Sequence, residues 1–116
     1  MQVSQIIEIL SAEVLCGEAH MSKEIDAAFG SDMMSDVLAF ATENTLLLTG
    51  LINTHVVRTA EMLDVRCIVF VRGKPVPQEI IEQADKLGIV MLATKHTLYV
   101  ACGILYAQGL PGCVRR

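Results

Sequence analysis

A chain of 116 residues is long enough for one hydrophobic core and too short for two. Its net charge of −4 and its sparse aromatic side chains, three Phe, two Tyr and no Trp, argue against a nucleic-acid interface, which needs cations for phosphates and rings for bases. No apolar run approaches the ~20 residues of a membrane span, and Met1–Leu10 lacks the basic start of a signal peptide, so we expect a cytoplasmic protein.

Apolar residues exceed what one small core requires. Hydrophobic residues make up 53% of the chain and charged residues only 19%, which leaves apolar side chains for the surface. We therefore expect a homodimer that buries this surface, although a well-filled core alone would also explain the composition.

The four cysteines are widely spaced. No two form the C-x-x-C pair on which zinc sites and redox dithiols usually depend. Cys16 and Cys67 fall inside predicted strands and Cys102 inside a predicted helix, where cysteine behaves as a small apolar side chain. We expect Cys113, in the glycine- and proline-containing tail, to be exposed. The sequence therefore predicts no cofactor and no metal site.

Strand and helix patterns alternate along the chain. Short apolar runs predict the strands, and apolar residues at three- and four-residue intervals predict the helices. In chain order the predicted elements are a helix at 4–10, a strand at 14–16, a strand at 25–29, a helix at 32–41, a strand at 46–49, a helix from 53 or 54 to 64, a strand at 65–71, a helix from about 77 to 87, a strand at 89–93 and a helix at about 95–108. The expected N-caps of the helices are Ser4, Ser31 or Asp32, Asn53 or Thr54, and Thr94.

This alternation indicates the fold class. Continuous apolar strands are typical of a parallel sheet covered on both faces. We therefore predict an α/β fold, a single three-layer domain with a mainly parallel sheet of about five strands flanked by helices. Its core should run from about 3 to 110, with a short tail at 111–116. The last helix is apolar around its whole axis, which indicates either a place in the centre of the core or a surface shared with a partner.

Three common catalytic or nucleotide-binding motifs are missing. A P-loop requires G-x-x-x-x-G-K-[ST], but around Gly73-Lys74 the first glycine is replaced by Ile68 and the hydroxyl residue by Pro75. No G-x-G-x-x-G follows a strand, and no G-x-S-x-G nucleophile elbow is present. These absences argue against P-loop kinase chemistry.

The turn between the strand at 46–49 and the next helix is the first candidate site. In open parallel sheets, ligands bind beyond the carboxyl ends of the strands, where helix N-termini attract anions. Asn53, Thr54 and His55 follow this strand, and Arg58 lies one helical turn later. A solvated helix cap followed by a surface histidine would explain the same residues.

The turn after the strand at 65–71 is the second candidate site. Arg72 and Lys74 could hold a phosphate or a carboxylate, and Gly73 would allow the backbone to approach it closely. An ordinary turn before Pro75 would need no ligand.

A third strand end carries Thr94, Lys95 and His96 at the start of the last helix. Three carboxyl ends with such side chains favour an anion-binding edge more than any one of them alone. We therefore take Thr94 with the residues of the other two turns as the candidate ligand-binding set.

Other polar residues have simpler explanations. Asp32 and Asp36 could bind a metal ion or act as an acid–base pair, but a solvated helical face explains them better. His20 lies in a polar stretch without a ligand-spaced partner, so we expect it at the surface. The spacing assembles no Ser/His/Asp or Cys/His set, and the sequence predicts no catalytic residue.

Four segments carry a resemblance to a known family. They are the Ser31–Phe40 helix, the strand and turn around Asn53–His55, the Val69–Pro75 turn and the Glu13–Glu18 strand and turn. Together with the order of elements, they resemble the DRTGG domain family over almost the whole chain, and the first segment is typical of stand-alone members. Such domains also occur inside phosphotransacetylases and CBS-containing pyrophosphatases, and are similar to the N-terminal domain of HPr kinase.

The resemblance implies an α/β sandwich that often dimerises and has a regulatory, ligand-sensing role without kinase activity. Stand-alone members often occur near iron-hydrogenase and redox-sensor genes, which implies an accessory role in that physiology. The name-giving residues differ here, because Thr54 and His55 stand in place of the Asp-Arg pair. Val71-Arg72-Gly73 stands in place of Thr-Gly-Gly.

Three functions follow from these observations. The first, which we favour, is a non-catalytic regulatory domain that binds a small anionic ligand such as a nucleotide. The alternative is a protein–protein interaction module that docks through its apolar last helix and has no small-molecule ligand. An enzyme is the third, and it would require a polar cleft that holds His55 or His96 beside a carboxylate.

Overall fold

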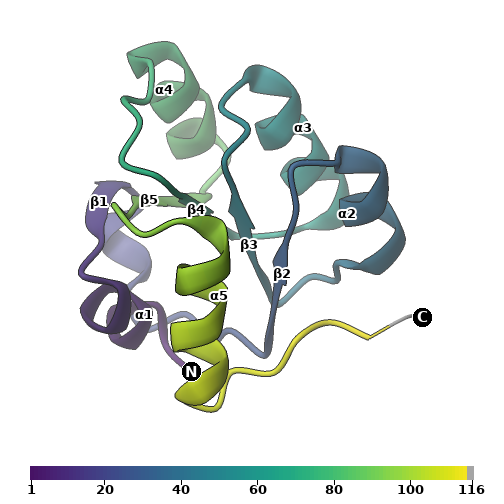
Figure 1. The fold of residues 1–116 in the computed structure, drawn as a ribbon. Helices are drawn as coiled ribbons and strands as arrows, with labels where there is room; N and C mark the ends of the chain where they lie inside the picture. The colour runs from purple at the N-terminus through teal and green to yellow at the C-terminus, as the bar shows by residue number, and fades with distance from the viewer. Residues whose placement is uncertain (115–116) are drawn as a thin grey trace.

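A five-stranded sheet in the order β1-β5-β4-β3-β2 forms the centre of the protein (Figure 1). The computed structural model describes residues 1–114, so that Arg115 and Arg116 of the predicted tail lie outside the described residues. The strands are β1 (Glu13–Cys16), β2 (Ala27–Gly30), β3 (Thr45–Thr49), β4 (Cys67–Phe70) and β5 (Val90–Ala93). The predicted number of strands and the predicted fold class are confirmed.

The sheet is parallel except at one edge. β2, β3, β4 and β5 run in the same direction, whereas β1 pairs antiparallel with β5 and places Glu13 opposite Ala93. The start of β1 therefore lies at the edge where the parallel strands end. An antiparallel edge strand on a parallel sheet is common, but its direction cannot be read from an apolar run of this length.

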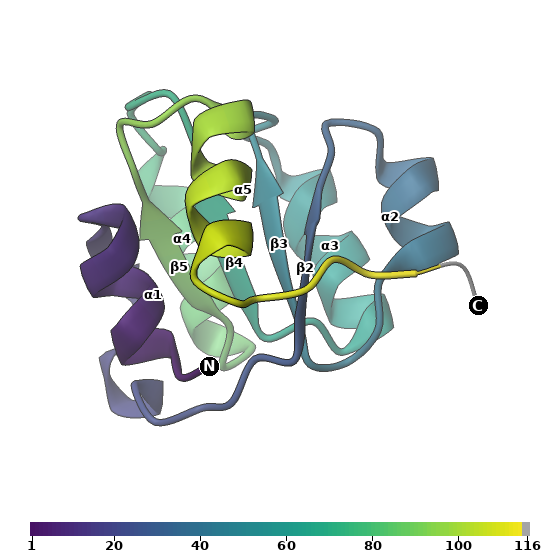
Figure 2. The same ribbon diagram turned by 60° about the horizontal axis from the view of Figure 1, so that its bottom comes forward.

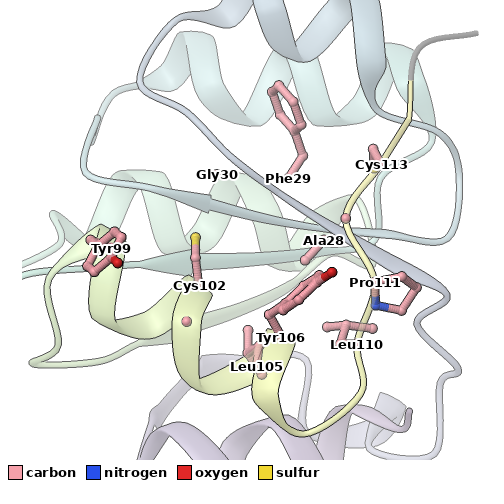
Figure 3. A pocket seen from close by; sticks show the side chains of 12 residues that line it. Ala28, Phe29, Gly30, Tyr99, Cys102, Leu105, Tyr106, Leu110, Pro111 and Cys113 are labelled. Carbon is pink, nitrogen blue, oxygen red and sulfur yellow. The ribbon is translucent and has the colours of Figure 1, made fainter.

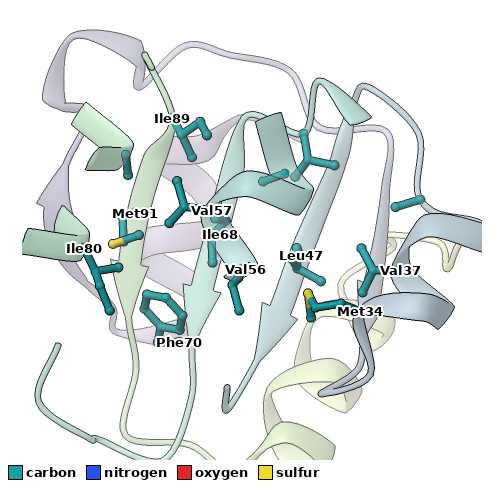
Figure 4. Packing of buried hydrophobic residues seen from close by; sticks show 14 of the residues in the cluster. Met34, Val37, Leu47, Val56, Val57, Ile68, Phe70, Ile80, Ile89 and Met91 are labelled. Atoms are coloured by element: carbon teal, nitrogen blue, oxygen red, sulfur yellow. The ribbon is translucent and has the colours of Figure 1, made fainter. Parts of the chain in front are cut away.

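Helices cover both faces of the sheet (Figures 1 and 2). They are α1 (Val3–Leu10), α2 (Met34–Phe40), α3 (Thr54–Leu63), α4 (Gln78–Lys86) and α5 (Leu98–Ala107), together with the 3₁₀ turn η1 (Glu18–His20). α2, α3 and α4 pack on one face, where Leu47, Ile68 and Met91 form part of the core (Figure 4). α1 and α5 pack on the other face, against Leu46 and Leu48.

β3 shows why the strands are continuously apolar. Its five residues are all buried, and successive side chains point to opposite faces, so that Leu47 packs under α2 and α3 whereas Leu46 and Leu48 pack under α1 and α5. A strand covered on both faces must be apolar at every position, which is the pattern that the sequence shows.

The helix starts differ from the prediction at three of four places. α1 is capped by Gln2, whose backbone N–H donates to the Gln5 side chain at 2.8 Å, and not by Ser4. α3 is capped by Asn53 as predicted, since the Asn53 side chain accepts a hydrogen bond from the Val56 backbone at 3.1 Å. α5 begins only at Leu98, so Thr94 is not its cap.

The start of α2 gives the third difference. The helix begins at Met34, and the Ser31 hydroxyl accepts a hydrogen bond from the Met33 backbone before the first turn. Asp32 does not cap the helix. Its carboxylate instead accepts hydrogen bonds from Thr49 and Gly50 at the turn between β3 and α3.

The last helix is not in the centre of the core. Ala101 and Leu105 are buried, but Tyr99 is 88% exposed and Tyr106 is 72% exposed. The prediction that the last helix lies in the centre of the core is therefore wrong. One apolar side of α5 faces outward.

The cysteines lie mostly as predicted. Cys16 and Cys67 are buried in strands, and Cys102 is half-buried in α5. Cys113 is also half-buried rather than exposed, because its sulfur lies 3.4 Å from the Thr45 hydroxyl.

Candidate functional site

Two of the predicted turns meet at the carboxyl edge of β4 and β5. The Arg72 backbone N–H donates to the His96 carbonyl at 2.8 Å, and the Gly73 backbone N–H donates to the Thr94 carbonyl at 3.0 Å. These bonds fasten the turn after β4 to the loop after β5. The structure thus joins two sets of residues that lie more than twenty positions apart in the sequence.

Arg72 has a left-handed backbone with a φ of 71°, and Gly73 follows with a φ of 64°. Among the described residues, the other non-glycine residues with positive φ are Ser11 and Asp64, and both are the C-caps of helices. A left-handed residue with a Cβ costs about 1 kcal/mol or more. At Arg72 the two backbone hydrogen bonds of the turn offset this cost, and they fix the direction in which its guanidinium leaves the chain.

The cations of this turn reach the end of the neighbouring strand β3. Arg72 Nη2 and Lys74 Nζ both donate to the Gly50 carbonyl, at 3.3 Å and 3.0 Å. A Cβ at Gly50 would clash with the guanidinium, so only glycine leaves room for it. Guanidinium has five N–H donors and ammonium has three. Each group therefore keeps donors for a further acceptor.

Asp32 holds the other side of the same turn. Its Oδ1 accepts hydrogen bonds from the Gly50 backbone N–H at 2.7 Å and from the Thr49 hydroxyl at 3.1 Å. Gly50 is thus fixed at its N–H by an acid and at its carbonyl by two cations. This role differs from the two uses that were expected of Asp32, capping of α2 and a solvated helical face.

A cleft of about 710 Å³ opens beside these turns. Its polar lining includes Lys74, Lys95 and His96, from the loops after β4 and β5, and Glu13 from the start of β1. Its apolar lining includes Leu10, Leu15, Pro75 and Val76. We call this the Gly73–His96 cleft.

The charged side chains of the cleft have no salt-bridge partners within residues 1–114. The two ion pairs of this part of the chain are Met1 with Glu24 and Arg66 with Asp64, and both lie outside the cleft lining. Unpaired cations on a concave surface are suited to an anion.

Thr94 stabilises the wall of the cleft and offers no free hydroxyl proton to a ligand. It is buried, and its hydroxyl donates to the Leu10 carbonyl at 2.9 Å, which ties the end of α1 to the end of β5. Its hydroxyl proton is therefore engaged within the protein.

The remaining predicted residues lie elsewhere. Thr54 and His55 are exposed on the first turn of α3 and are not part of the cleft lining. Arg58 faces a separate groove between α3 and α4, which it shares with Glu61 and Glu82. The structure thus brings together four of the predicted residues, Arg72, Gly73, Lys74 and Thr94. Hydrogen bonds from Arg72 and Lys74 to the Gly50 carbonyl connect them to the turn that precedes Asn53. Arg58 lies apart from this group.

Glu13 was missed by sequence reasoning. In the sequence it stands before a short apolar run, at the start of the Glu13–Glu18 segment, which carried the family resemblance but suggested no binding role for Glu13. Only the antiparallel direction of β1 brings it to the carboxyl edge of β5. A periodicity argument does not contain that information.

Within the described part of the chain, no group of three or more His, Cys, Asp or Glu side chains is placed to hold a metal ion. None of the helices there is both long enough and apolar enough to cross a membrane.

A profile of the DRTGG domain family matches residues 5–106. The chain belongs to the DRTGG domain family. The resemblance carried by its four segments is therefore confirmed. Comparison with curated proteins found no match.

A solved structure shares the fold of this DRTGG domain. It is the regulatory region of Clostridium perfringens pyrophosphatase, with CBS and DRTGG domains, in complex with its activator diadenosine tetraphosphate. The TM-score is 0.76 at 22% identity, over 98% of this chain and 50% of the other. The chain thus spans half the length of that regulatory region, and the likeness shows the fold.

The DRTGG domain has a second concavity, an apolar groove of about 390 Å³ between β2, α5 and the tail (Figure 3). Figure 3 shows Cys102 and Tyr106 of α5 on one side and the tail with Cys113 on the other. The tail is held by backbone pairing, since Ala28 donates to the Pro111 carbonyl at 2.9 Å and accepts from the Cys113 N–H at 3.0 Å. We call this the α5 groove.

Proposed function

We propose that this DRTGG domain is a non-catalytic regulatory unit that senses a small anionic ligand, such as a nucleotide, in the Gly73–His96 cleft. The observation that carries the proposal is that Lys74 and Lys95 line a cleft of ligand size without salt bridges within residues 1–114, while Arg72, outside the lining, shares the Gly50 carbonyl with Lys74. Concave sites of ~300–1,000 Å³ are typical for small ligands. The activator bound by the pyrophosphatase regulatory region, a dinucleotide, agrees with this ligand class.

The cleft is less suited to catalysis. His96 and Glu13 line the same cleft, as an enzyme would require, but no hydrogen bond or ion pair joins them in the described structure. A general base normally needs a partner that orients it. The geometry therefore supports binding without a reaction.

Thermal unfolding with added ligand tests the proposal. A ligand at 100 times its dissociation constant stabilises the folded state by about 2.7 kcal/mol, so ATP and inorganic tripolyphosphate should raise the melting temperature by several degrees. Lys95→Gln should reduce the shift, because it removes a cleft cation. Arg58→Gln is the matched control, since it removes a cation in the groove between α3 and α4. No shift with either compound would overturn the proposal.

The second candidate function is self-association through the exposed side of α5. Tyr99 and Tyr106 leave large apolar rings in solvent beside the α5 groove, and a second copy of the chain could cover them. Light scattering measures this directly: we expect a dimer that Tyr99→Ser with Tyr106→Ser converts to a monomer. A monomeric unmodified protein would rule it out.

The cellular setting belongs to the proposal as well. The accessory role in iron-hydrogenase and redox physiology is supported only by the resemblance to stand-alone members. Deleting the gene should alter hydrogenase activity in the cells that carry it, and an unchanged activity would contradict this setting.

A further inference from the structure

We infer that Glu13 determines which anion the Gly73–His96 cleft accepts, and that the ligand is a nucleoside phosphate with its phosphates at Lys74 and Lys95 and its ribose hydroxyls at Glu13. This inference rests on the proposed function. It adds the class of the ligand, its orientation and a specificity-determining residue.

The acid and the cations come from different elements. Glu13 lies at the start of β1 and is paired in register with Ala93. Lys74 comes from the turn after β4, and Lys95 follows β5, where its side chain packs within 3.6 Å of the position that a Cβ of Gly73 would occupy. Lys74 and Lys95 thus both come from loops that follow parallel strands, whereas Glu13 comes from the antiparallel strand.

The two kinds of charge do not neutralise each other. No ion pair joins Glu13 to Lys74 or Lys95 within residues 1–114. A carboxylate and two ammonium groups thus line one cleft and remain open to a ligand. A ligand that contacts both must offer negative charge at one end and hydrogen-bond donors at the other.

This requirement separates nucleoside phosphates from simpler anions. A carboxylate repels a polyphosphate but accepts hydrogen bonds from hydroxyl groups, as acidic residues do for ribose in dinucleotide-binding folds. The lysines repel any cationic ligand. A phosphorylated molecule with a hydroxyl-bearing part satisfies both ends.

The apolar lining accounts for the rest of the ligand. Leu10, Leu15 and Val76 line the same cleft, and its volume of about 710 Å³ exceeds what a phosphate group alone would fill. Planar bases bind against apolar side chains by contact area and shape. We therefore place the base on this apolar part, with the ribose between it and the phosphates.

Isothermal titration with ATP, 2′-deoxy-ATP and tripolyphosphate tests the inference. The unmodified protein should bind ATP about tenfold more tightly than tripolyphosphate, and 2′-deoxy-ATP should bind more weakly than ATP, because a lost hydroxyl leaves an acceptor unpaired. Glu13→Ala should weaken ATP binding and strengthen tripolyphosphate binding, so that the two affinities converge. Glu13→Gln keeps an acceptor and should preserve part of the ATP preference.

Glu79→Ala is the control, because Glu79 lines the groove between α3 and α4. It should leave the three affinities unchanged. Glu13 is exposed, so melting temperatures of its variants should match that of the unmodified protein and exclude a folding defect.

The possible results distinguish a failure of the Glu13 role from a failure of the proposed anion-binding function. Tripolyphosphate binding at least as tight as ATP, or an ATP preference that Glu13→Ala leaves intact, overturns the role of Glu13 while the anion site stands. Absence of binding by all three compounds overturns the proposed function together with the inference.

Discussion

The Gly73–His96 cleft and the α5 groove are two concavities of the same sheet with opposite chemistry. The cleft has Glu13, Lys74 and Lys95 in its lining, whereas the lining of the α5 groove contains no charged side chain among the described residues. The cleft lies where parallel strands end, and the groove lies where the edge strand β2 meets α5. The Gly73–His96 cleft, at the carboxyl ends of the strands, is therefore suited to an ion, and the α5 groove, at the sheet edge, is suited to an apolar surface.

The two regions also use glycine for opposite purposes. Gly30 in the groove lets α5 approach β2, since a Cβ there would lie 2.7 Å from Cys102 Sγ and 3.2 Å from Leu98 Cδ1. Gly50 beside the cleft makes room for the mobile end of the Arg72 side chain. One glycine therefore serves packing, and the other serves the placement of a cation.

The largest expected effect is that of Gly30→Ala. The added methyl group must push α5 away from β2, and overpacking of this kind costs about 1–3 kcal/mol. Urea unfolding of the single variant and of Gly30→Ala with Cys102→Ala measures it. The double variant should regain part of the loss, because the sulfur that the methyl group meets is gone. A single variant as stable as the unmodified protein would show that α5 is not closely packed there.

Thr94→Val should give the next largest effect, in the floor of the cleft. It removes the donor to the buried Leu10 carbonyl, and an unsatisfied buried acceptor costs about 1–3 kcal/mol. Thr94→Ser keeps the hydroxyl and should be closer to the unmodified protein in urea unfolding. Equal stability of the Val and Ser variants would mean that the α1–β5 tie contributes nothing.

Gly50→Ala should change stability little, by about 0.5 kcal/mol or less, because the atom it meets is the end of a flexible side chain. It should nevertheless weaken tripolyphosphate binding, since Arg72 has to leave its place beside the Gly50 carbonyl. Chemical unfolding and titration calorimetry on the same sample separate the two effects. Unchanged binding would remove Arg72 from the site.

The smallest effect on stability is expected from alkylation of a cysteine in the α5 groove. Burial raises the pKa of Cys16 to about 11 and also raises the pKa values of Cys67 and Cys102. A higher thiol pKa means less thiolate at pH 8, so N-ethylmaleimide should react first with Cys113. Mass spectrometry identifies the site, and Cys16 should stay unmodified at pH 8, because it is buried and its raised pKa keeps it a thiol there. ATP binding to the labelled protein should be unchanged, and a loss would show that groove and cleft are coupled.

The sequence predicted those features that depend on the local chain alone. Apolar runs such as Leu46–Leu48 predicted strands correctly, and Asn53 predicted a helix start, because the local chain decides both. Thr94 looked like a cap of the same type. It was not, because the loop that follows it is fastened to Arg72 and the helix begins later.

Half of the site could be predicted and half could not. Arg72, Gly73 and Lys74 follow a strand directly, so the rule for carboxyl ends finds them. Glu13 reaches the same edge through the antiparallel direction of β1, and Asp32, which precedes α2, reaches it by accepting a hydrogen bond from the Gly50 N–H. Both depend on long-range geometry, which a single sequence does not express.

The pairing of the tail with β2 bears on how the protein stays apart from other copies of itself. An edge strand of a sheet offers unpaired backbone groups to any passing strand, which is a common route to aggregation. Pro111 and Cys113 occupy both backbone groups of Ala28, and proline has no N–H to offer further. These few residues therefore cover the β2 edge at Ala28, and we expect a chain shortened before Pro111 to aggregate more readily.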